Sequence, residues 1–319
     1  MWDVWKRLFA AALVAVIVGV SVAQESTEPT QSLTTPHQDV PAPEPHPELK
    51  PLVEDIRTLL GNGKFQDALP KADELLQQAK AKSDKVGEAY ALHFRATALQ
   101  EMRKTAPDQL PEVAALWASA LALWREIGDG AYQVEALLGQ AYCLWRASPE
   151  RAQALLEEAL KLAKGEAKRP LAIAAALHNA GVDWVEVGQL SVAETLVQQA
   201  LEIFENLVPN SLLVAYPLNL LGGIAQVQGK LEQAEQLLQQ ALVIRKNFAP
   251  NSLEVAQTLH NLGNVTNDRG DLARAEQYFQ QALAIYKTLA PNSLQVAGTL
   301  HNLGNVAADR GDLARAEQL

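Results

Sequence analysis

Cysteine is nearly absent from this sequence: Cys143 is the only one among 319 residues. A single cysteine excludes an internal disulfide framework. Cys143 lies in the apolar stretch AYCLW, whereas a catalytic thiol needs a histidine and an acidic residue arranged around it. This setting predicts a small buried core residue.

Aromatic residues and positive charge are also scarce. Aromatics make up 6% of the sequence and hydrophobic residues 48%, which favours helices packed through alanine and leucine over an aromatic-rich β core. The formal net charge is −10, whereas binding to nucleic acid phosphates needs a basic surface. We therefore expect a helical protein that does not bind nucleic acid.

The common catalytic motifs are missing as well. The sequence contains no H-E-x-x-H, no G-x-S-x-G and no phosphate-binding P-loop. Gly61-Asn62-Gly63 follows a helical pattern rather than a strand, so it predicts a turn and not a dinucleotide site. His178, His260 and His301 share one repeat position, and no second metal ligand stands beside any of them. We expect no enzymatic activity, no cofactor and no metal.

The N-terminal segment has the pattern of a secretory signal peptide. Two basic residues precede the apolar stretch Leu8–Val20, which is followed by the small-residue ending Ser21-Val22-Ala23. This pattern predicts a signal peptide over residues 1–23, cleaved after Ala23, and export to the periplasm or the exterior. The alternative is an uncleaved anchor, but Leu8–Ala23 is shorter than the about 20 residues that span a bilayer. After cleavage we expect no membrane span.

A proline-rich linker follows the signal peptide. Residues 24–51 hold seven of the 16 prolines and very few large apolar residues. Such a segment buries too little apolar surface to fold, and its prolines favour an extended polyproline II conformation. We expect residues 24–51 to be a disordered tether.

The remainder of the chain is repetitive, with a period of 41 residues. Two series of glycines have this spacing: Gly181, Gly222, Gly263 and Gly304, and Gly188, Gly229, Gly270 and Gly311. Self-similarity at such a period is typical of a solenoid, in which each unit buries its apolar face against its neighbours.

Each repeat contains the signals for two helices. Ser252 is a suitable N-cap for a first helix, which ends at Gly270, where a left-handed backbone costs little. Asp271 is then placed to cap a second helix, and Pro291 prevents that helix from continuing. Small residues at Gly263 and Ala275 would let the two helices approach closely.

These spacings resemble the tetratricopeptide repeat. The matching residues are Leu262-Gly263, Ala275, Ala282 and Pro291. The common unit has 34 residues, and the longer unit is similar to the repeats of kinesin light chains and of many bacterial proteins. The family's tyrosine after the glycine is absent, and Thr266 stands there. The resemblance implies an all-α fold, a right-handed α-solenoid of antiparallel helix pairs.

Repeat quality divides the chain further. We expect degenerate units over residues 52–170 and regular 41-residue units over 171–319, six complete units in all and a truncated seventh. Residues 249–278 and 290–319 differ at five positions, which indicates recent duplication. The last unit stops within its second helix, and a solenoid end needs a polar cap, so we expect this chain to be a fragment.

The family resemblance also implies where ligands bind, because first helices of tetratricopeptide repeats line a concave groove. His260, Asn264 and Asp268 follow one helical face at i, i+4 and i+8. Alternatively, Asn261 and Asn302 bond to neighbouring repeats. The candidate ligand-binding residues are His178, Asn219, Gln257, His260, Asn261, Asn264, Asp268, His301, Asn302, Asn305 and Asp309.

Three functions remain open at this stage. The first is an exported scaffold that binds a protein or a neutral to basic peptide segment in its groove. The second, from the resemblance, is the sensor arm of a bacterial protein with a caspase-like CHAT protease domain. The third is self-association through the open solenoid end. Arg269-Gly270-Asp271 also spells a cell-adhesion tripeptide, although a turn between helices needs the same glycine and capping aspartate.

Overall fold

The computed structural model describes residues 40–104, 106–165 and 168–318. The expected signal peptide and residues 24–39 of the expected linker lie outside the described residues. Within those described ranges the regular structure is entirely helical, which confirms the all-α fold. The chain divides into two compact units, whose described parts are residues 40–184 and 185–318.

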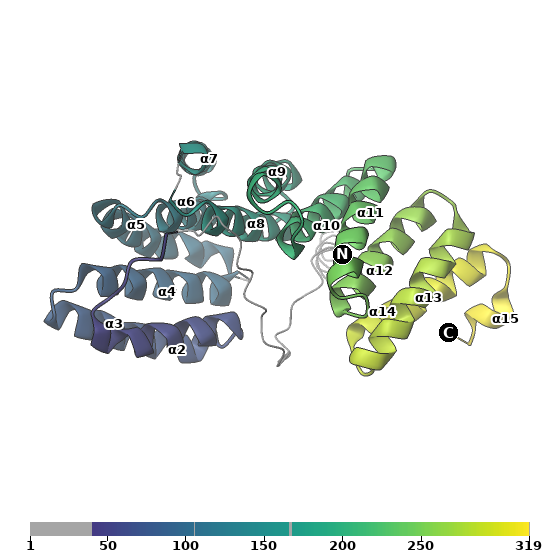
Figure 1. The fold of residues 1–319 in the computed structure, drawn as a ribbon, viewed down its shortest axis with the longest axis horizontal. Helices are drawn as coiled ribbons and strands as arrows, with labels where there is room; N and C mark the ends of the chain where they lie inside the picture. Colours follow the sequence, from purple (N-terminus) through teal and green to yellow (C-terminus); the bar gives the residue numbers. More distant parts are fainter. Residues whose placement is uncertain (1–39, 105, 166–167, 319) are drawn as a thin grey trace. The chain divides into compact units, whose positions relative to one another are not determined.

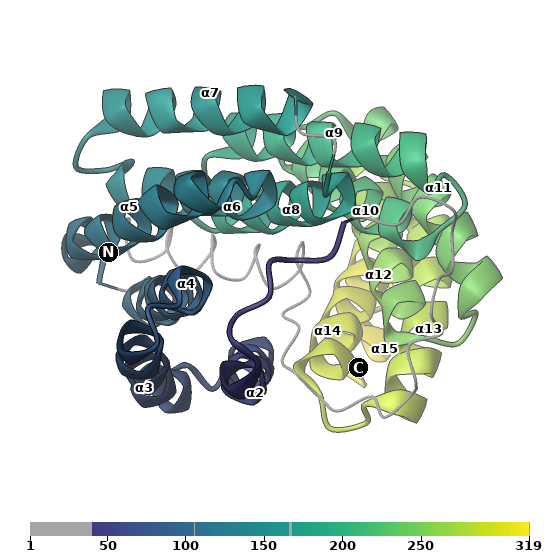
Figure 2. The same cartoon turned by 60° about the vertical axis from the view of Figure 1, so that its left-hand side comes forward.

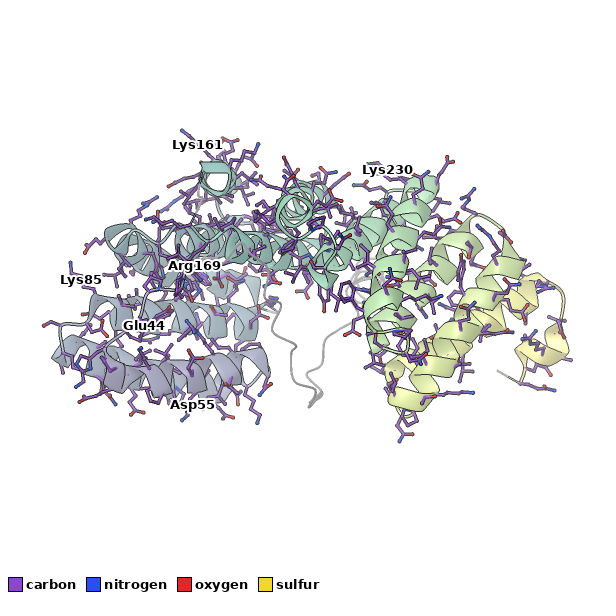
Figure 3. All side chains as sticks on the ribbon, viewed as in Figure 1. Glu44, Asp55, Lys85, Lys161, Arg169 and Lys230 are labelled. Carbon is purple, nitrogen blue, oxygen red and sulfur yellow. The ribbon has the colours of Figure 1, made fainter. Side chains whose placement is uncertain are left out.

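The N-terminal unit consists of α-helices that follow one another along the repeats, with two short 3₁₀ helices, η1 and η2 (Figure 1). Its elements are η1 (Pro47–Leu49), α2 (Lys50–Gly61), α3 (Phe65–Ala81), α4 (Lys85–Arg103), η2 (Pro107–Gln109), α5 (Leu110–Ile127), α6 (Gly130–Leu144), α7 (Pro149–Gly165) and most of α8 (Pro170–Glu186). Exposed lysines such as Lys161 of α7 project from its outer helices (Figure 3).

The C-terminal unit continues with the regular repeats. Its elements are α9 (Leu190–Leu207), α10 (Leu212–Val227), α11 (Leu231–Phe248), α12 (Leu253–Asp268), α13 (Leu272–Leu289), α14 (Leu294–Asp309) and α15 (Leu313–Ala316). Starting from α2, consecutive helices form the first and second helix of each expected repeat.

Helix contacts follow the order expected of a solenoid. The closest packing is between helices that are neighbours in sequence, as of α10 against α11 and of α12 against α13. The first helices of successive pairs also contact one another: α2 contacts α4, α4 contacts α6, α10 contacts α12, and α12 contacts α14. We call the side of each unit formed by these first helices its first-helix face (Figure 2).

The expected linker is shorter than the sequence indicated. Residues 40–49 are placed against the N-terminal unit, with Pro45 and Leu49 buried, and α2 begins at Lys50. Pro51 lies in the first turn of α2, where a proline is tolerated because the first helical N–H groups have no intrahelical acceptor. The prediction of a tether up to Pro51 is therefore wrong for residues 40–51.

The turns between helices have the predicted chemistry. Gly270 has a φ of +80°, and the carboxylate of Asp271 accepts a hydrogen bond from the Arg274 N–H at 3.2 Å. Ser252 caps α12 by accepting from the Val255 N–H at 3.3 Å. Gly63 has a φ of +68° directly after α2, so the segment Gly61–Gly63 is the expected turn.

Helical glycines make room for side chains of the following helix. A Cβ atom built on Gly263 would lie 2.5 Å from the Phe279 ring, and one on Gly222 would lie 2.6 Å from Leu238. The sequence suggested that Gly263 lets the backbone near Ala275 approach. In the structure, the aromatic ring of Phe279 fills the space beside Gly263 instead. The contact joins α12 to α13 within one repeat.

The N-terminal unit has a more aromatic core than the regular repeats. Its buried cluster includes Tyr90, Phe94 and Trp124. Cys143 of α6 is also buried, and burial raises the pKa of its thiol to about 12. A thiol with such a pKa stays protonated at neutral pH, which supports the expected structural role of this cysteine.

Replacing Gly263 by alanine should destabilise the protein by about 1–3 kcal/mol, because the added methyl group overlaps the Phe279 ring. The matched control is Gly298→Ala in α14, since a Cβ at Gly298 has nothing within 4 Å. There, the higher helix propensity of alanine should stabilise by about 0.5–1 kcal/mol. Urea unfolding midpoints of the two variants test this, and equal shifts would contradict the packing described.

Candidate functional site

The candidate residues differ in solvent exposure, and only some of them face solvent. His178 lies in α8 of the N-terminal unit and is half-buried; the other candidates belong to the C-terminal unit. Four of these are exposed: Asp268, His301, Asn305 and Asp309. Gln257, Asn264 and Asn302 are half-buried, and Asn219, His260 and Asn261 are buried.

His260 is bound to the next repeat and is only 8% exposed, so the expectation that it faces a ligand is wrong. Its Nδ1 lies 3.0 Å from the hydroxyl of Thr299, which donates its own proton to the Gln295 carbonyl. Nδ1 therefore carries the proton and donates to Thr299. The other ring nitrogen, Nε2, then accepts from the Asn302 side-chain amide at 3.3 Å.

This arrangement holds His260 in its neutral form. Burial lowers the pKa of His260 from its ordinary 6.5 to about 4. Both ring nitrogens already have partners that suit the neutral tautomer, and a second ring proton would point at the Asn302 amide group. His260 is consequently an element of the α12–α14 interface.

Asn302 confirms that asparagines on this face bond to the neighbouring repeat. Its amide group donates to the Asn264 side-chain oxygen at 2.9 Å and also contacts His260. Both acceptors lie in α12 and the donor in α14. The alternative reading of this residue as an inter-repeat contact is therefore correct.

Asn261, the equivalent residue one repeat earlier, has a different environment. Position 223, which corresponds to Asn264, is glycine, so α10 offers no second side-chain acceptor there. Among the described residues, neither the Asn261 side-chain amide nor the Asn219 side-chain oxygen has a hydrogen-bond partner, although both residues are buried. Buried polar atoms without partners cost stability, which makes this interface weaker than the next.

The exposed candidates lie along α12 and α14 and make this part of the first-helix face polar and acidic. Asp268 and Asp309 are the last residues of α12 and α14, where the negative end of the helix macrodipole adds to their charge. Asp268 accepts from the Gln226 amide at 2.8 Å, and Asn305 contacts His301 at 3.2 Å. This surface attracts positive charge and offers amide and imidazole groups for hydrogen bonds.

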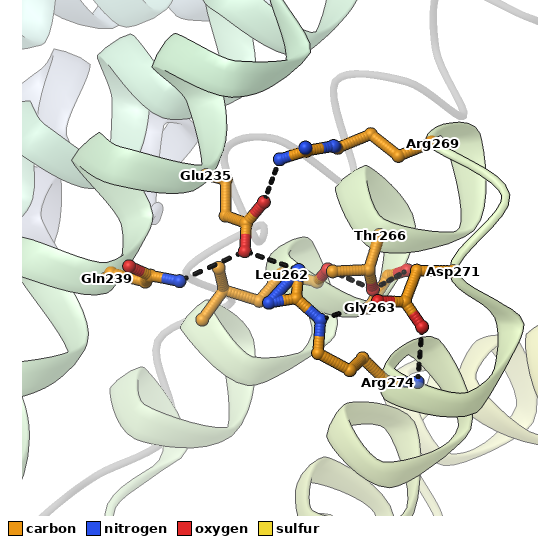
Figure 4. A network of polar contacts seen from close by, with 8 residues as sticks. All are labelled: Glu235, Gln239, Leu262, Gly263, Thr266, Arg269, Asp271 and Arg274. Carbon is orange, nitrogen blue, oxygen red and sulfur yellow. Dashed lines mark hydrogen bonds and ion pairs between the residues drawn. The ribbon is translucent and has the colours of Figure 1, made fainter.

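The Arg269-Gly270-Asp271 tripeptide is an inter-repeat clamp, which sequence reasoning missed (Figure 4). Arg269 and Arg274 both pair with Glu235 of α11, the latter at 2.6 Å, and the Glu235 side chain is only 7% exposed. Asp271 caps α13 and bonds the Arg274 guanidinium at 2.8 Å. With both ends of the tripeptide engaged internally, the adhesion reading is wrong.

The clamp recurs in the next repeat. Glu276 pairs with Arg310 and Arg315, which stand 41 residues after Arg269 and Arg274. One repeat earlier, Glu194 binds the Gln228 amide at 2.8 Å and Lys230 at 3.4 Å. The sequence signal was a glutamate and two arginines recurring with the repeat period, and it links each second helix to the following turn.

Among the described residues, no group of three or more histidine, cysteine, aspartate or glutamate side chains has the arrangement of a metal site. Of the helices described, none is both long enough and apolar enough to cross a membrane.

Comparison with known families identifies the repeats. The tetratricopeptide repeat profile matches residues 172–247, 213–288 and 254–319, in windows that begin 41 residues apart. Among curated proteins, no sequence matches this chain. The profile match agrees with the repeat boundaries that the helices show.

Several solved structures have a similar fold. BtubC (BKLC) from P. vanneervenii is 24% identical with a TM-score of 0.55, covering 67% of this chain and 87% of that one. The apo form of RapI is 13% identical with a TM-score of 0.64, covering 84% and 73%. A Rap protein complexed with competence and sporulation factor is 14% identical with a TM-score of 0.50, covering 86% and 75%. At these identities, the similarity shows a common α-solenoid fold.

Acidification should destabilise the protein through His260. Above about pH 6.5 the His260 side chain is neutral in both the folded and the unfolded state, so its titration does not change the stability there. Between pH 6.5 and 4 the unfolded state binds a proton that the folded state excludes, and at pH 5 this costs about 2 kcal/mol. In His260→Asn, which carries the residue found at position 219, the loss between pH 7 and 5 should be smaller by that amount. Urea unfolding at both pH values measures the unfolding free energy. An equal decrease from pH 7 to pH 5 in the two proteins would refute the effect.

Glu235→Gln should loosen the clamp, because Arg269 then loses its ion-pair partner and Arg274 keeps only Asp271 of its own repeat. Both guanidinium groups are about two-fifths exposed and become hydrated, so we expect a loss of about 1–2 kcal/mol in unfolding free energy. Glu232→Gln on the exposed side of the same helix is the control and should change it by less than about 0.5 kcal/mol. Equal thermal midpoints for the two variants would mean that the clamp contributes nothing.

Proposed function

Because residues 172–319 belong to the tetratricopeptide repeat family, we propose that this protein is a scaffold whose C-terminal first-helix face binds a segment of another protein. The observation that carries the proposal is the exposed polar surface of α12 and α14. Its exposed candidate residues include Asp268 and Asp309, the last residues of α12 and α14. Among the buried candidates, His260 bonds to α14 and so helps to keep this surface in place.

The chemistry of the surface favours a neutral to basic segment. Asp268 and Asp309 lie one repeat apart on successive first helices, and both are exposed. Their carboxylates attract lysine or arginine side chains, while the Asn305 amide both donates and accepts hydrogen bonds. A segment bound in an extended conformation presents such donors and acceptors along its backbone.

The comparison structures support binding as the use of this fold. The Rap protein was solved in complex with competence and sporulation factor, so a solenoid of similar fold accommodates a bound partner. The C-terminal unit has the same kind of helix pairs, and its inter-repeat bonds leave the ends of α12 and α14 exposed. These observations support a binding role.

The double variant Asp268→Asn, Asp309→Asn should weaken binding of basic peptides. Peptides would first be selected on the wild-type protein from a randomised library, and lysine or arginine should be enriched among them. Each exposed carboxylate removed should weaken affinity by up to about fivefold and reduce its dependence on salt. Fluorescence anisotropy with a labelled selected peptide measures both effects.

The control removes the same charge elsewhere. Glu202→Gln with Glu232→Gln changes two exposed carboxylates on the second helices α9 and α11. This variant should bind the peptide as the wild type does. Selection of acidic peptides, or an equal loss of affinity in both variants, would show that the first-helix face is not the binding surface.

A further inference from the structure

The N-terminal unit already holds an extended peptide, which is the chain's own segment Val40–His46. This segment has no helical or strand structure and leads directly into η1. It starts beside the residues that precede α8 and passes to α2 (Figures 1 and 2). We call it the strap. Its three prolines, Pro41, Pro43 and Pro45, alternate with other residues.

The strap is held mainly through its backbone. The Tyr90 hydroxyl donates to the Pro43 carbonyl at 2.9 Å, and the Val40 N–H donates to the Lys168 carbonyl at 2.9 Å. At the other end, the His46 N–H donates to the Asp84 carboxylate at 2.7 Å. Since prolines have no N–H, every second residue of the strap needs no acceptor. Such bonding recognises an extended proline-containing backbone rather than particular side chains.

The residues that receive the strap are fixed by contacts of their own. Tyr90 is 1% exposed, and its ring lies edge-on to Trp124 and Tyr132 at centroid distances of 5.1 and 5.3 Å. Burial raises the pKa of the Tyr90 hydroxyl, which therefore remains a donor. Asp84 caps α4 through its other carboxylate oxygen, which accepts from the Val86 N–H at 3.1 Å.

Two arginines contact the group formed by Asp84, Tyr90, Trp124 and Tyr132, and we call this group the platform. The guanidinium of Arg57 lies 4.9 Å from the centre of the Tyr90 ring and donates to the Tyr132 hydroxyl at 3.1 Å. Arg169 lies 4.9 Å from the centre of the Tyr132 ring and pairs with Asp129 at 2.8 Å. Figure 3 labels Arg169 and, on the strap, Glu44. None of these contacts involves the strap, so releasing the strap breaks none of them.

We propose that this platform is a second peptide site, specific for extended proline-containing segments, and that the strap occupies it in cis. A free segment of the same kind competes with the strap for the Tyr90 hydroxyl and the Asp84 carboxylate. The site lies within residues 40–184, so it does not depend on the function proposed for the C-terminal unit.

The covalent connection decides which occupant wins. The strap continues without a spacer into Pro47–Leu49, and Leu49 is fully buried in the core. Tethering at such short range gives an effective concentration in the millimolar range. A free peptide at micromolar concentration therefore binds only when the strap has been released.

The test uses the full chain and a fluorescein-labelled peptide with the sequence of residues 40–46, VPAPEPH. Pro45→Asp places a charge where the strap is buried and should release it. This variant should bind the peptide at least tenfold more tightly than the wild-type chain does. Adding Tyr90→Phe to it removes the donor to Pro43 and should weaken binding about two- to tenfold. A peptide with alanine in place of its three prolines is the matched probe and should bind more weakly.

Circular dichroism must first show wild-type helicity for Pro45→Asp. If helicity is lost, the triple variant Pro41→Ser, Pro43→Ser, Pro45→Ser replaces it, with the same expected result and no added charge. Hydrogen exchange of the wild type gives an independent reading: the Val40 and His46 amides should be protected, and Tyr90→Phe should reduce that protection. Equal peptide binding by wild type and a folded strap variant, or no binding by either, would overturn the proposal.

Discussion

Within the regular repeats, a glycine of the first helix leaves a space that a large side chain of the second helix fills. Phe279 fills it at Gly263, and Leu238 fills it at Gly222. This contact sets how closely the two helices of a pair approach. Because a lone helix pair cannot bury its apolar face, the next pair must cover it, and the position of every later pair depends on that approach. The polar contacts between repeats, including the Glu235 clamp, act on helices that the glycine contact has already placed.

Features decided within one or two turns of chain could be predicted from the sequence. Ser252 and Asp271 cap their helices as expected, because each side chain bonds an N–H group three residues away. Gly270 ends its repeat's first helix with a positive φ for the same local reason. The 41-residue period then extends these local signals along the chain, which is why the number and order of helix pairs followed from the sequence.

Features decided between distant residues could not be predicted. His260 has the spacing of a surface residue on its own helix, yet Thr299 and Asn302, about 40 residues later, bury it. The sequence places Arg269 in an exposed turn, whereas in the structure it pairs with Glu235, 34 residues earlier. The prediction that the strap is a disordered tether was wrong for a related reason. Its composition indicates that it cannot bury a core of its own, but does not show that a surface elsewhere in the chain binds it.

The two units use one helix-pair architecture for different surfaces. In the regular repeats polar residues of the neighbouring first helices α12 and α14 bond to one another, so Asn302 and His260 stabilise the array, while the ends of these helices remain exposed. In the degenerate repeats Tyr90 and Trp124 form an aromatic platform instead, and the Tyr90 hydroxyl is directed at a backbone carbonyl. A repeat whose sequence has diverged from its neighbours loses the contacts that depend on identical neighbours. Its side chains can instead bind a segment that is not a repeat. The loss of periodicity upstream of residue 171 therefore coincides with the part of the chain that holds an extended peptide.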